Sequence, residues 1–308
     1  MNIVALAGGT GAAKFLRGLC QVASPADLTI IGNTGDDLEL FGLSISPDLD
    51  TVGYTLSDRI DTEKGWGVAG DTFHLRAALE DLGEKTYFAL GDKDLAVHVL
   101  RTERLRRGVP LSRVTAELGS LWGLQSRLLP MSDEPVRTRV RTPSGWLAFQ
   151  EFFVRERYQP EVVEISYDGA EDARPAPGVL EAIRAADAIL ICPSNPISSV
   201  GPILAVPGIR EALAARRSAV TAVSPVIGES PVSGPAGKMM RARGYPVTVL
   251  GVADVYHGLL SRLFIDPRDA GRASALRELG IEPTITDIMM PDREREVVLA
   301  RAVLGAAT

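Results

Sequence analysis

The chain has 308 residues, enough for one large α/β domain or two small domains with a sizeable core. Hydrophobic residues make up 45% and charged residues 23%, as in an ordinary globular protein, and the net charge of −6 argues against a nucleic-acid-binding surface. No apolar run reaches the ~18 residues that a membrane span requires. Strand-like residues begin at position 2, and Cys20 and Cys192 do not make a disulfide framework, so we expect no signal peptide and predict a cytoplasmic protein without membrane contact.

The first element is a short apolar run, Met1 to Leu6, which predicts a buried parallel strand. The glycine loop Gly8-Gly9-Thr10-Gly11 follows, and apolar residues at helical spacing continue from Phe15. Such a loop places backbone N–H groups and the positive end of a helix dipole at one point, which favours a bound phosphate. The loop is neither a Walker A sequence nor a full dinucleotide fingerprint, because Lys14 stands in the place of the third glycine. We predict that this lysine and the loop bind phosphate; a plain glycine turn with a solvated lysine is the alternative.

Two acidic segments come next. Gly32 to Asp37 directly follows a second predicted strand, and Pro47 to Thr51 is expected to be an extended loop in which Asp48 and Asp50 point to the same side. The four aspartates between positions 36 and 50 repel one another unless a cation is near, and hard oxygen ligands beside phosphate suit Mg²⁺. We predict that Asp36 and Asp50 hold Mg²⁺ and that Asp48 or Asp50 orients or deprotonates an attacking hydroxyl. Ordinary turn formation is the alternative.

A third strand is predicted over Tyr87 to Leu90, after a helix that Asp71 caps. Gly91-Asp92-Lys93-Asp94 would then lie at the same sheet edge as the glycine loop. We predict that Lys93 reaches a phosphate or substrate carboxylate there; a capped helix start with a solvated lysine is the alternative. Trp66, between two glycines, is either a stacking platform for a planar ring or a packing residue.

The rest of the sequence, from about residue 95, predicts an inserted region and then a second series of alternating strands and helices. Residues of about 95 to 175 read as two helices, a hairpin and a further strand; these are 95–107, 110–124, 136–140, 146–149 and 161–167. Buried strands are then predicted at 188–191, 219–223, 247–250, 263–265 and 284–286, with helices between them. Such alternation predicts an α/β fold with a doubly wound, mostly parallel Rossmann-like sheet, and we expect one domain over residues 1–308.

Polar residues also follow the strand at 188–191. Ser194 and Asn195 are predicted to bind phosphate or a base edge, and an ordinary turn is the alternative. The histidines, His74, His98 and His257, have no metal-ligand spacing and are interpreted as structural or surface residues.

The ordered set of motifs carries a resemblance to one family. The set is Gly8 to Gly11 with Lys14, Gly32 to Asp37, Pro47 to Thr51, Gly65-Trp66-Gly67, Leu90 to Ala96 and Pro193-Ser194-Asn195-Pro196. In this order, over nearly the whole chain, it resembles the 2-phospho-L-lactate transferases of coenzyme F-420 biosynthesis. The whole set is far more specific than any of its members.

The resemblance implies a reaction. A guanosine diphosphate-linked donor transfers a phospho-acyl group, either 2-phospholactyl, phosphoenolpyruvyl or phosphoglyceryl, to the ribityl hydroxyl of 7,8-didemethyl-8-hydroxy-5-deazariboflavin, and GMP is released. The resemblance further implies a Mg²⁺ requirement, deazaflavin contacts near Asp50 and Lys93, guanosine diphosphate over the glycine loop, and a homodimer. The residues fit all three donor acids equally and identify no single general base.

The residues alone leave two alternative functions. The gluconeogenesis-factor-like branch shares the glycine loop and would make the chain a nucleotide-sugar-binding regulator without turnover, but residues 47–51 and 91–94 favour the transferase. An NAD-dependent dehydrogenase is disfavoured by Lys14 and by Asn33, which stands where such enzymes carry an acid.

Overall fold

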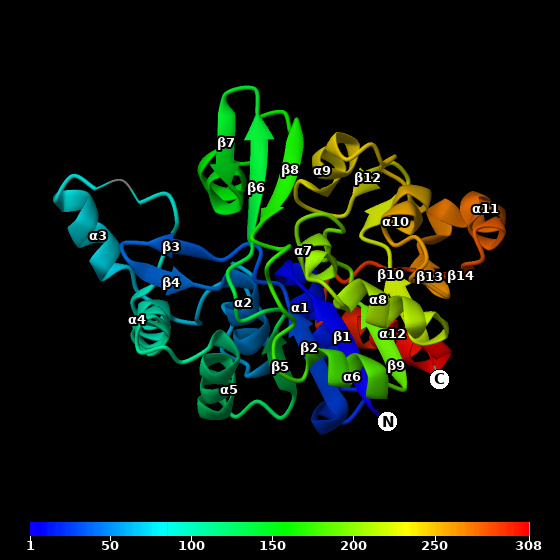
Figure 1. Cartoon of the computed structure of the whole chain (residues 1–308), viewed down its shortest axis with the longest axis horizontal. Helices are drawn as coiled ribbons and strands as arrows, with labels where there is room; N and C mark the ends of the chain where they lie inside the picture. Colours follow the sequence, from blue (N-terminus) through cyan, green and yellow to red (C-terminus); the bar gives the residue numbers. More distant parts are fainter. Residues whose placement is uncertain (85, 308) are drawn as a thin grey trace.

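A seven-stranded parallel sheet forms the centre of the molecule in the computed structural model, which describes residues 1–84 and 86–307 (Figure 1). Its order is β14-β13-β10-β9-β1-β2-β5. The strands are β1 (Ile3–Ala7), β2 (Leu28–Gly32), β5 (Arg127–Pro130), β9 (Ala188–Ile191), β10 (Val220–Val223), β13 (Arg262–Ile265) and β14 (Glu282–Ile285). Because every pairing in this sheet is parallel, the predicted doubly wound α/β fold is confirmed.

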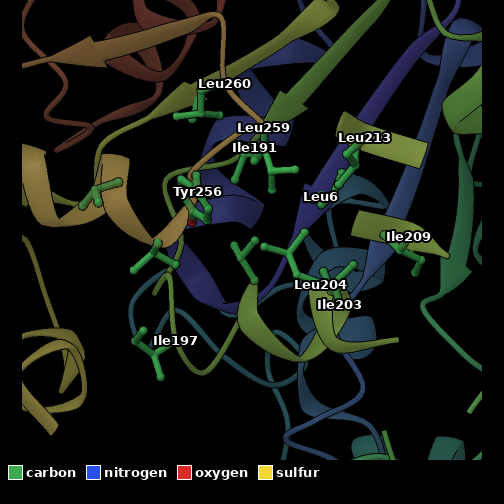
Figure 2. Packing of buried hydrophobic residues seen from close by; sticks show 14 of the residues in the cluster. Leu6, Ile191, Ile197, Ile203, Leu204, Ile209, Leu213, Tyr256, Leu259 and Leu260 are labelled. Carbon is green, nitrogen blue, oxygen red and sulfur yellow. The ribbon is translucent and has the colours of Figure 1, made fainter. Parts of the chain in front are cut away.

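Helices cover both faces of the sheet because its strands are apolar on both sides. Ile3 and Ala5 of β1 pack on one face, and Val4 and Leu6 pack on the other. The first face is covered by α1 (Gly9–Leu19), α2 (Pro47–Leu56), α5 (Leu111–Trp122) and α12 (Arg293–Ala307). The second is covered by α6 (Val179–Ala185), α7 (Gly201–Ala205), α8 (Ile209–Ala215), α9 (Ala236–Ala242), α10 (Val249–Val255) and α11 (Ala273–Glu278). Figure 2 shows side chains of this second core, from β1 to the segment after α10, pointing toward one another.

The strand order reverses at β1, which pairs with β2 on one side and β9 on the other. In open α/β sheets this reversal opens a crevice at the carboxyl ends of the strands, where ligands bind. The loops after β1 and β9 meet there: a Cβ added to Gly11 would lie 2.5 Å from the carbonyl oxygen of Pro193. A side chain at position 11 would therefore push the two loops apart.

The predicted insertion is divided in two by a strand of the main sheet. The helix α4 (Asp92–Arg106) and α5 confirm the predicted helices, and an antiparallel sheet of β6 (Arg137–Thr142), β7 (Gly145–Ala148) and β8 (Glu164–Asp168) confirms the hairpin and the strand after it. However, β5 lies between them and pairs with β2. The predicted strand over Tyr87 to Leu90 is wrong: this segment forms no strand, and its first three residues are only partly buried, whereas a strand inside a parallel sheet must be covered on both faces.

Smaller elements complete the fold. They are the hairpin β3 (Leu38–Leu40) with β4 (Leu43–Ile45), the helix α3 (His74–Asp81), and the short pair β11 (Val226–Ile227) with β12 (Ser230–Pro231). The predicted strand at 247–250 is wrong, because Thr248 caps the start of α10 by accepting a hydrogen bond from the Gly251 N–H. Short apolar runs do not distinguish a strand from a buried helix.

A buried ion pair fixes α1 against α12. Arg17 donates to Glu296 through Nε (2.8 Å) and Nη2 (2.7 Å), and the Glu296 side chain is only 2% exposed. The helices approach closely beside the pair, because a Cβ added to Gly18 would lie 2.3 Å from the Glu296 carbonyl oxygen. The pair therefore supports the helix that carries the glycine loop.

Replacing Arg17 by Met is expected to lower the free energy of unfolding by about 3–5 kcal/mol, because the Glu296 carboxylate stays buried without its partner. Urea unfolding followed by circular dichroism measures the change. The double variant Arg17→Met with Glu296→Leu is the control and should recover most of the loss. A loss below about 1 kcal/mol in the single variant would mean that the pair behaves like a solvent-exposed one.

Candidate active site

One large cavity, of about 690 Å³, opens at the carboxyl edge of the sheet. Its floor is made by the glycine loop and by the segments that follow β2 and β9, and its walls come from the regions around Trp66, Tyr87, Phe149, Val232 and Met289. Predicted site residues that line it are Gly8, Gly9, Thr10, Gly11, Lys14, Asp36, Asp48, Ser194 and Asn195. The cavity thus brings together most of the residues that the sequence singled out.

The glycine loop presents the start of α1 to this cavity. Gly8 is extended and Gly9, the first helical residue, has φ +76°, a conformation that favours glycine. The first turn of α1 carries no acidic residue, and the exposed Lys14 side chain reaches the cavity one turn later. Helix dipole and lysine therefore make this end of the cavity favourable for an anion.

Asp48 ties the glycine loop to its neighbours. Its Oδ1 accepts a hydrogen bond from the Gly9 N–H at 2.8 Å, and its Oδ2 accepts one from Asn33 Nδ2 at 2.9 Å. The Asn33 amide also donates to the Ser198 carbonyl at 3.2 Å and accepts from the Gly35 N–H at 2.8 Å. One buried amide thus links the segment after β2, the first turn of α2 and the loop after β9. From the sequence, Asn33 was cited against a dehydrogenase and as part of the family motif Gly32 to Asp37, without a structural role.

The carboxylate of Asp36 lies near Asp48 and is 95% buried, with its Oδ1 unpaired. Burial, with the charge of Asp48 added to it, raises the pKa of Asp36 well above the ordinary value. Burial also raises the pKa of Asp48 to about 6, although the hydrogen bonds from Asn33 and Gly9 oppose the rise. Burial likewise raises the pKa of Asp37 to about 7, against the charge of Arg137 and the Ser46 hydrogen bond. These adjacent carboxyl groups need a positive charge to be fully ionised together.

Further buried oxygens around Asp36 lack partners among the described residues. They are Thr34 Oγ1, Asp37 Oδ1, Thr138 Oγ1 and Ser194 Oγ. Unpaired buried oxygens are rare in folded proteins and call for an explanation such as an ion or water. A set of carboxylate and hydroxyl oxygens beside an anion-binding helix start fits a hard cation such as Mg²⁺.

Comparison with known proteins agrees with this geometry. The family described as 2-phospho-L-lactate transferase CofD matches residues 3–275. A phosphoenolpyruvate transferase of Streptomyces griseus is 47% identical, with 100% of this chain and 98% of the relative covered, and a 2-phospho-L-lactate transferase of Methanosarcina acetivorans is 43% identical, with 98% of each covered. The chain belongs to the 2-phospho-L-lactate transferase family. It is a transferase of the phospholactate or phosphoenolpyruvate type.

The fold has a relative among solved structures as well. A member of the upf0052 family from Bacillus halodurans aligns with a TM-score of 0.65 at 18% identity, covering 98% of this chain and 99% of the other. At this identity the likeness concerns the fold alone. No helix of the described residues is long and apolar enough to cross a membrane.

In this transferase Asp50 lies apart from the cavity. Residues 47–51 form the first turns of α2 rather than the expected extended loop, so side chains two residues apart point in directions about 200° from each other. Asp48 faces the glycine loop, whereas Asp50 makes two hydrogen bonds with the buried Arg101, one of them at 3.0 Å from Nη1. The expectation that both carboxylates point to one side is therefore wrong, and Asp50 is not among the residues that line the cavity.

Asp50 belongs to a buried cluster with Asp94 and His98 whose spacing would suit a metal ion. His98 Nδ1 lies 3.8 Å from Asp50 and its Nε2 lies 3.4 Å from Asp94, which also accepts a hydrogen bond from the Tyr54 hydroxyl at 2.6 Å. The guanidinium of Arg101, 2% exposed, already supplies the positive charge that these carboxylates need. The interpretation of His98 as a structural residue agrees with this arrangement.

Lys93 also lies outside the cavity lining. It sits in the first turn of α4, and its Nζ donates to the carbonyl oxygens of Ala69 (3.2 Å) and Gly70 (2.9 Å). Two carboxylates brace this region. Asp71, expected to cap α3, accepts hydrogen bonds from the first N–H groups of α4 instead, and Asp92 caps α3. The predicted role of Lys93 at the acceptor stays a prediction.

Part of the cavity wall is aromatic. Phe149 and Phe153 are stacked at 5.6 Å between ring centroids and both line the cavity, as do Trp66, Tyr87 and Phe88. Trp66 is 41% exposed, which agrees with the stacking alternative for this residue better than with packing. The cavity therefore has an anion-binding end and an apolar end suited to a planar ring.

Proposed function

We propose that this transferase moves a phospho-acyl group from a guanosine diphosphate-linked donor to the ribityl hydroxyl of 7,8-didemethyl-8-hydroxy-5-deazariboflavin and releases GMP. The juxtaposition of the glycine loop, Lys14 and the unpaired Asp36 carboxylate in one cavity with an aromatic wall supports this most directly. The diphosphate fits the first end and the tricyclic deazaflavin the second. The phospholactate and phosphoenolpyruvate names of the relatives support a donor of this class.

In the proposed reaction the ribityl oxygen attacks the phosphorus that carries the acid, a new O–P bond forms, and the anhydride bond to GMP breaks. The N–H groups at the start of α1 and Lys14 hold the diphosphate oxygens that gain charge. Asp48, held in place by Gly9 and Asn33, orients the attacking hydroxyl and accepts its proton. Ser194 and Asn195 border the same end of the cavity and contact the phosphate or the base.

A divalent cation fits the carboxylates of this site. Asp36 lines the cavity with an unpaired oxygen and would hold Mg²⁺, with Asp48 beside it; Asp50, assigned to the ion from the sequence, would first have to leave Arg101. Bound Mg²⁺ neutralises phosphate charge. The requirement for Mg²⁺ is part of the proposal.

Purified protein mixed with the deazaflavin, Mg²⁺ and each of the three donors tests this function, with the product mass and GMP as readouts. Transfer from at least one donor, abolished by chelation of the metal, is the expected result. Tight binding of guanosine diphosphate without GMP release from any donor would instead favour the regulator. Light scattering of the same sample tests the proposed homodimer, whose mass would be twice 32.9 kDa.

Replacing Lys14 by Met is expected to raise the Kd for guanosine diphosphate roughly tenfold to a hundredfold, the range for a lost hydrogen bond to a charged group. Calorimetric titration measures this Kd directly, without turnover. Arg113→Met, which removes the same charge from an exposed position on α5, is the control and should bind normally. An unchanged Kd in Lys14→Met would move the phosphate away from the glycine loop.

A further inference from the structure

The inserted sheet places a buried threonine against the segment that carries Asp36. Thr138, on the central strand β6, is 2% exposed. Its backbone N–H donates to the Gly35 carbonyl at 2.7 Å, and a Cβ added to Gly35 would lie 2.8 Å from Thr138 Oγ1. The hydroxyl is thus packed directly against the backbone that precedes Asp36.

Both side chains carry an unpaired oxygen. Thr138 Oγ1 and Asp36 Oδ1 are buried and make no hydrogen bond within residues 1–84 and 86–307. Thr138 Oγ1 lies against Gly35, the residue directly before Asp36. Burial raises the pKa of Asp36, and the Thr138 hydroxyl opposes this rise. Gln150, two residues after β7, donates to the Asp36 carbonyl at 3.4 Å. Thr138 and the segment after β7 therefore contact the backbone at Gly35 and Asp36.

We propose that Thr138 is a positioning residue for Asp36: when a divalent cation binds, the Thr138 hydroxyl donates to one carboxylate oxygen and leaves the other directed into the cavity, toward the cation. This inference rests on the proposed role of Asp36 in holding Mg²⁺. Groups that hydrogen-bond to metal ligands orient them, and their loss typically lowers metal affinity or activity 10- to 100-fold. The position of the inserted sheet over the sheet edge then has a function, which is to fix a carboxylate that burial alone would leave unpaired.

Stability distinguishes this role from simple packing. In the metal-free protein the Thr138 hydroxyl has no hydrogen-bond partner among the described residues, so it adds nothing to the free energy of unfolding, and replacing it by an apolar group of the same shape is close to neutral or stabilising. Valine has the shape of threonine without the hydroxyl. The variant Thr138→Val should therefore remain folded, with an unfolding midpoint equal to or above that of the wild type.

Mn²⁺ serves as a spectroscopic probe, with binding measured by electron paramagnetic resonance in the presence of guanosine diphosphate. Thr138→Val should weaken Mn²⁺ binding roughly tenfold to a hundredfold, while calorimetry in chelator shows unchanged nucleotide affinity. Thr138→Ser, which keeps the hydroxyl, should restore Mn²⁺ binding. Thr142→Val is the matched control: Thr142 is buried on the same face of β6, but its hydroxyl donates to the Gly145 carbonyl in the hairpin turn. It should bind Mn²⁺ like the wild type.

Equal Mn²⁺ affinity in wild type and Thr138→Val would overturn the inference. A loss that Thr138→Ser fails to restore would also overturn it, because packing volume rather than the hydroxyl would then matter. A wild-type protein that binds nucleotide but no Mn²⁺ would contradict the proposed metal role of Asp36 itself, and this inference with it.

Discussion

Replacing Asp36 by Asn is expected to lower turnover roughly 100- to 1,000-fold, the loss that follows removal of one preorganised charged or polar group from a transition-state site. The protein should stay folded, because the amide has the shape of the carboxylate and Asp36 Oδ1 has no hydrogen-bond partner among the described residues that the substitution could remove. Steady-state release of GMP measures turnover. The effect should appear in kcat, since in the proposed reaction the Asp36 carboxylate acts on the diphosphate through the cation and does not contact the deazaflavin ring.

The same variant should be more stable than the wild type in the absence of metal. The pKa values of Asp36, Asp48 and Asp37 are all raised in the folded protein, the latter two to about 6 and 7 from an ordinary 3.8. The folded state therefore binds more protons than the unfolded state, and stability falls as the pH rises from the ordinary value through the raised values. Asn does not titrate, so Asp36→Asn should lose less stability over this window.

Urea unfolding in chelator, at about pH 5 and about pH 8, measures this difference. Added Mg²⁺ should stabilise the wild type at the higher pH and the variant much less. Asp81→Asn, which alters an exposed carboxylate on α3, is the control and should match the wild type in turnover and pH dependence. Turnover within about threefold of wild type in Asp36→Asn would remove this residue from the proposed reaction.

The parts of the site that are local in sequence were predictable. A strand, a glycine loop and a helix in succession define the anion-binding end without any distant contact, and Lys14 and Asp36 lie within reach of it because they follow adjacent parallel strands. The predicted orientation of Asp48 and Asp50 was wrong, and the reason is also local in sequence. Pro47 at the first helical position and acidic residues in the first turn are helix-start signals, and a helix separates two residues that an extended chain would align.

The other features that were not predicted depend on contacts between residues far apart in the sequence. Thr138 contacts Gly35, and Arg101 binds Asp50, which is 51 positions away in the chain. The periodicity of each segment does not indicate which distant residue it will contact. Lys93 was expected at the sheet edge because a strand was predicted at Tyr87 to Leu90. The strand that pairs with β2 is instead β5, so Lys93 does not follow a strand of the sheet. The role of Asn33 could have been predicted from its position, because a polar side chain directly after a central strand lies where the loops of the site converge.

Replacing Asp50 by Asn is expected to lower both turnover and stability, and the two losses have separate causes. The free energy of unfolding should fall by about 3–5 kcal/mol, because the buried guanidinium of Arg101 loses the negative charge that pairs with it. Turnover should fall by roughly two orders of magnitude or more, if the carboxylate leaves Arg101 to meet the deazaflavin or the cation when substrates bind. Urea unfolding and GMP release measure the two quantities on the same preparation.

A double variant separates the causes. Asp50→Asn with Arg101→Met removes both charges, so most of the lost stability should return, because buried pairs replaced by neutral groups are often as stable as the original. Turnover should remain low, since the carboxylate is still missing. Arg101→Met alone retains the carboxylate but leaves it buried and unpaired, and should be about as unstable as Asp50→Asn. Turnover that returns with stability in the double variant would make Asp50 a structural anchor of α2 and α4, and would leave the chemistry to Asp36 and Asp48.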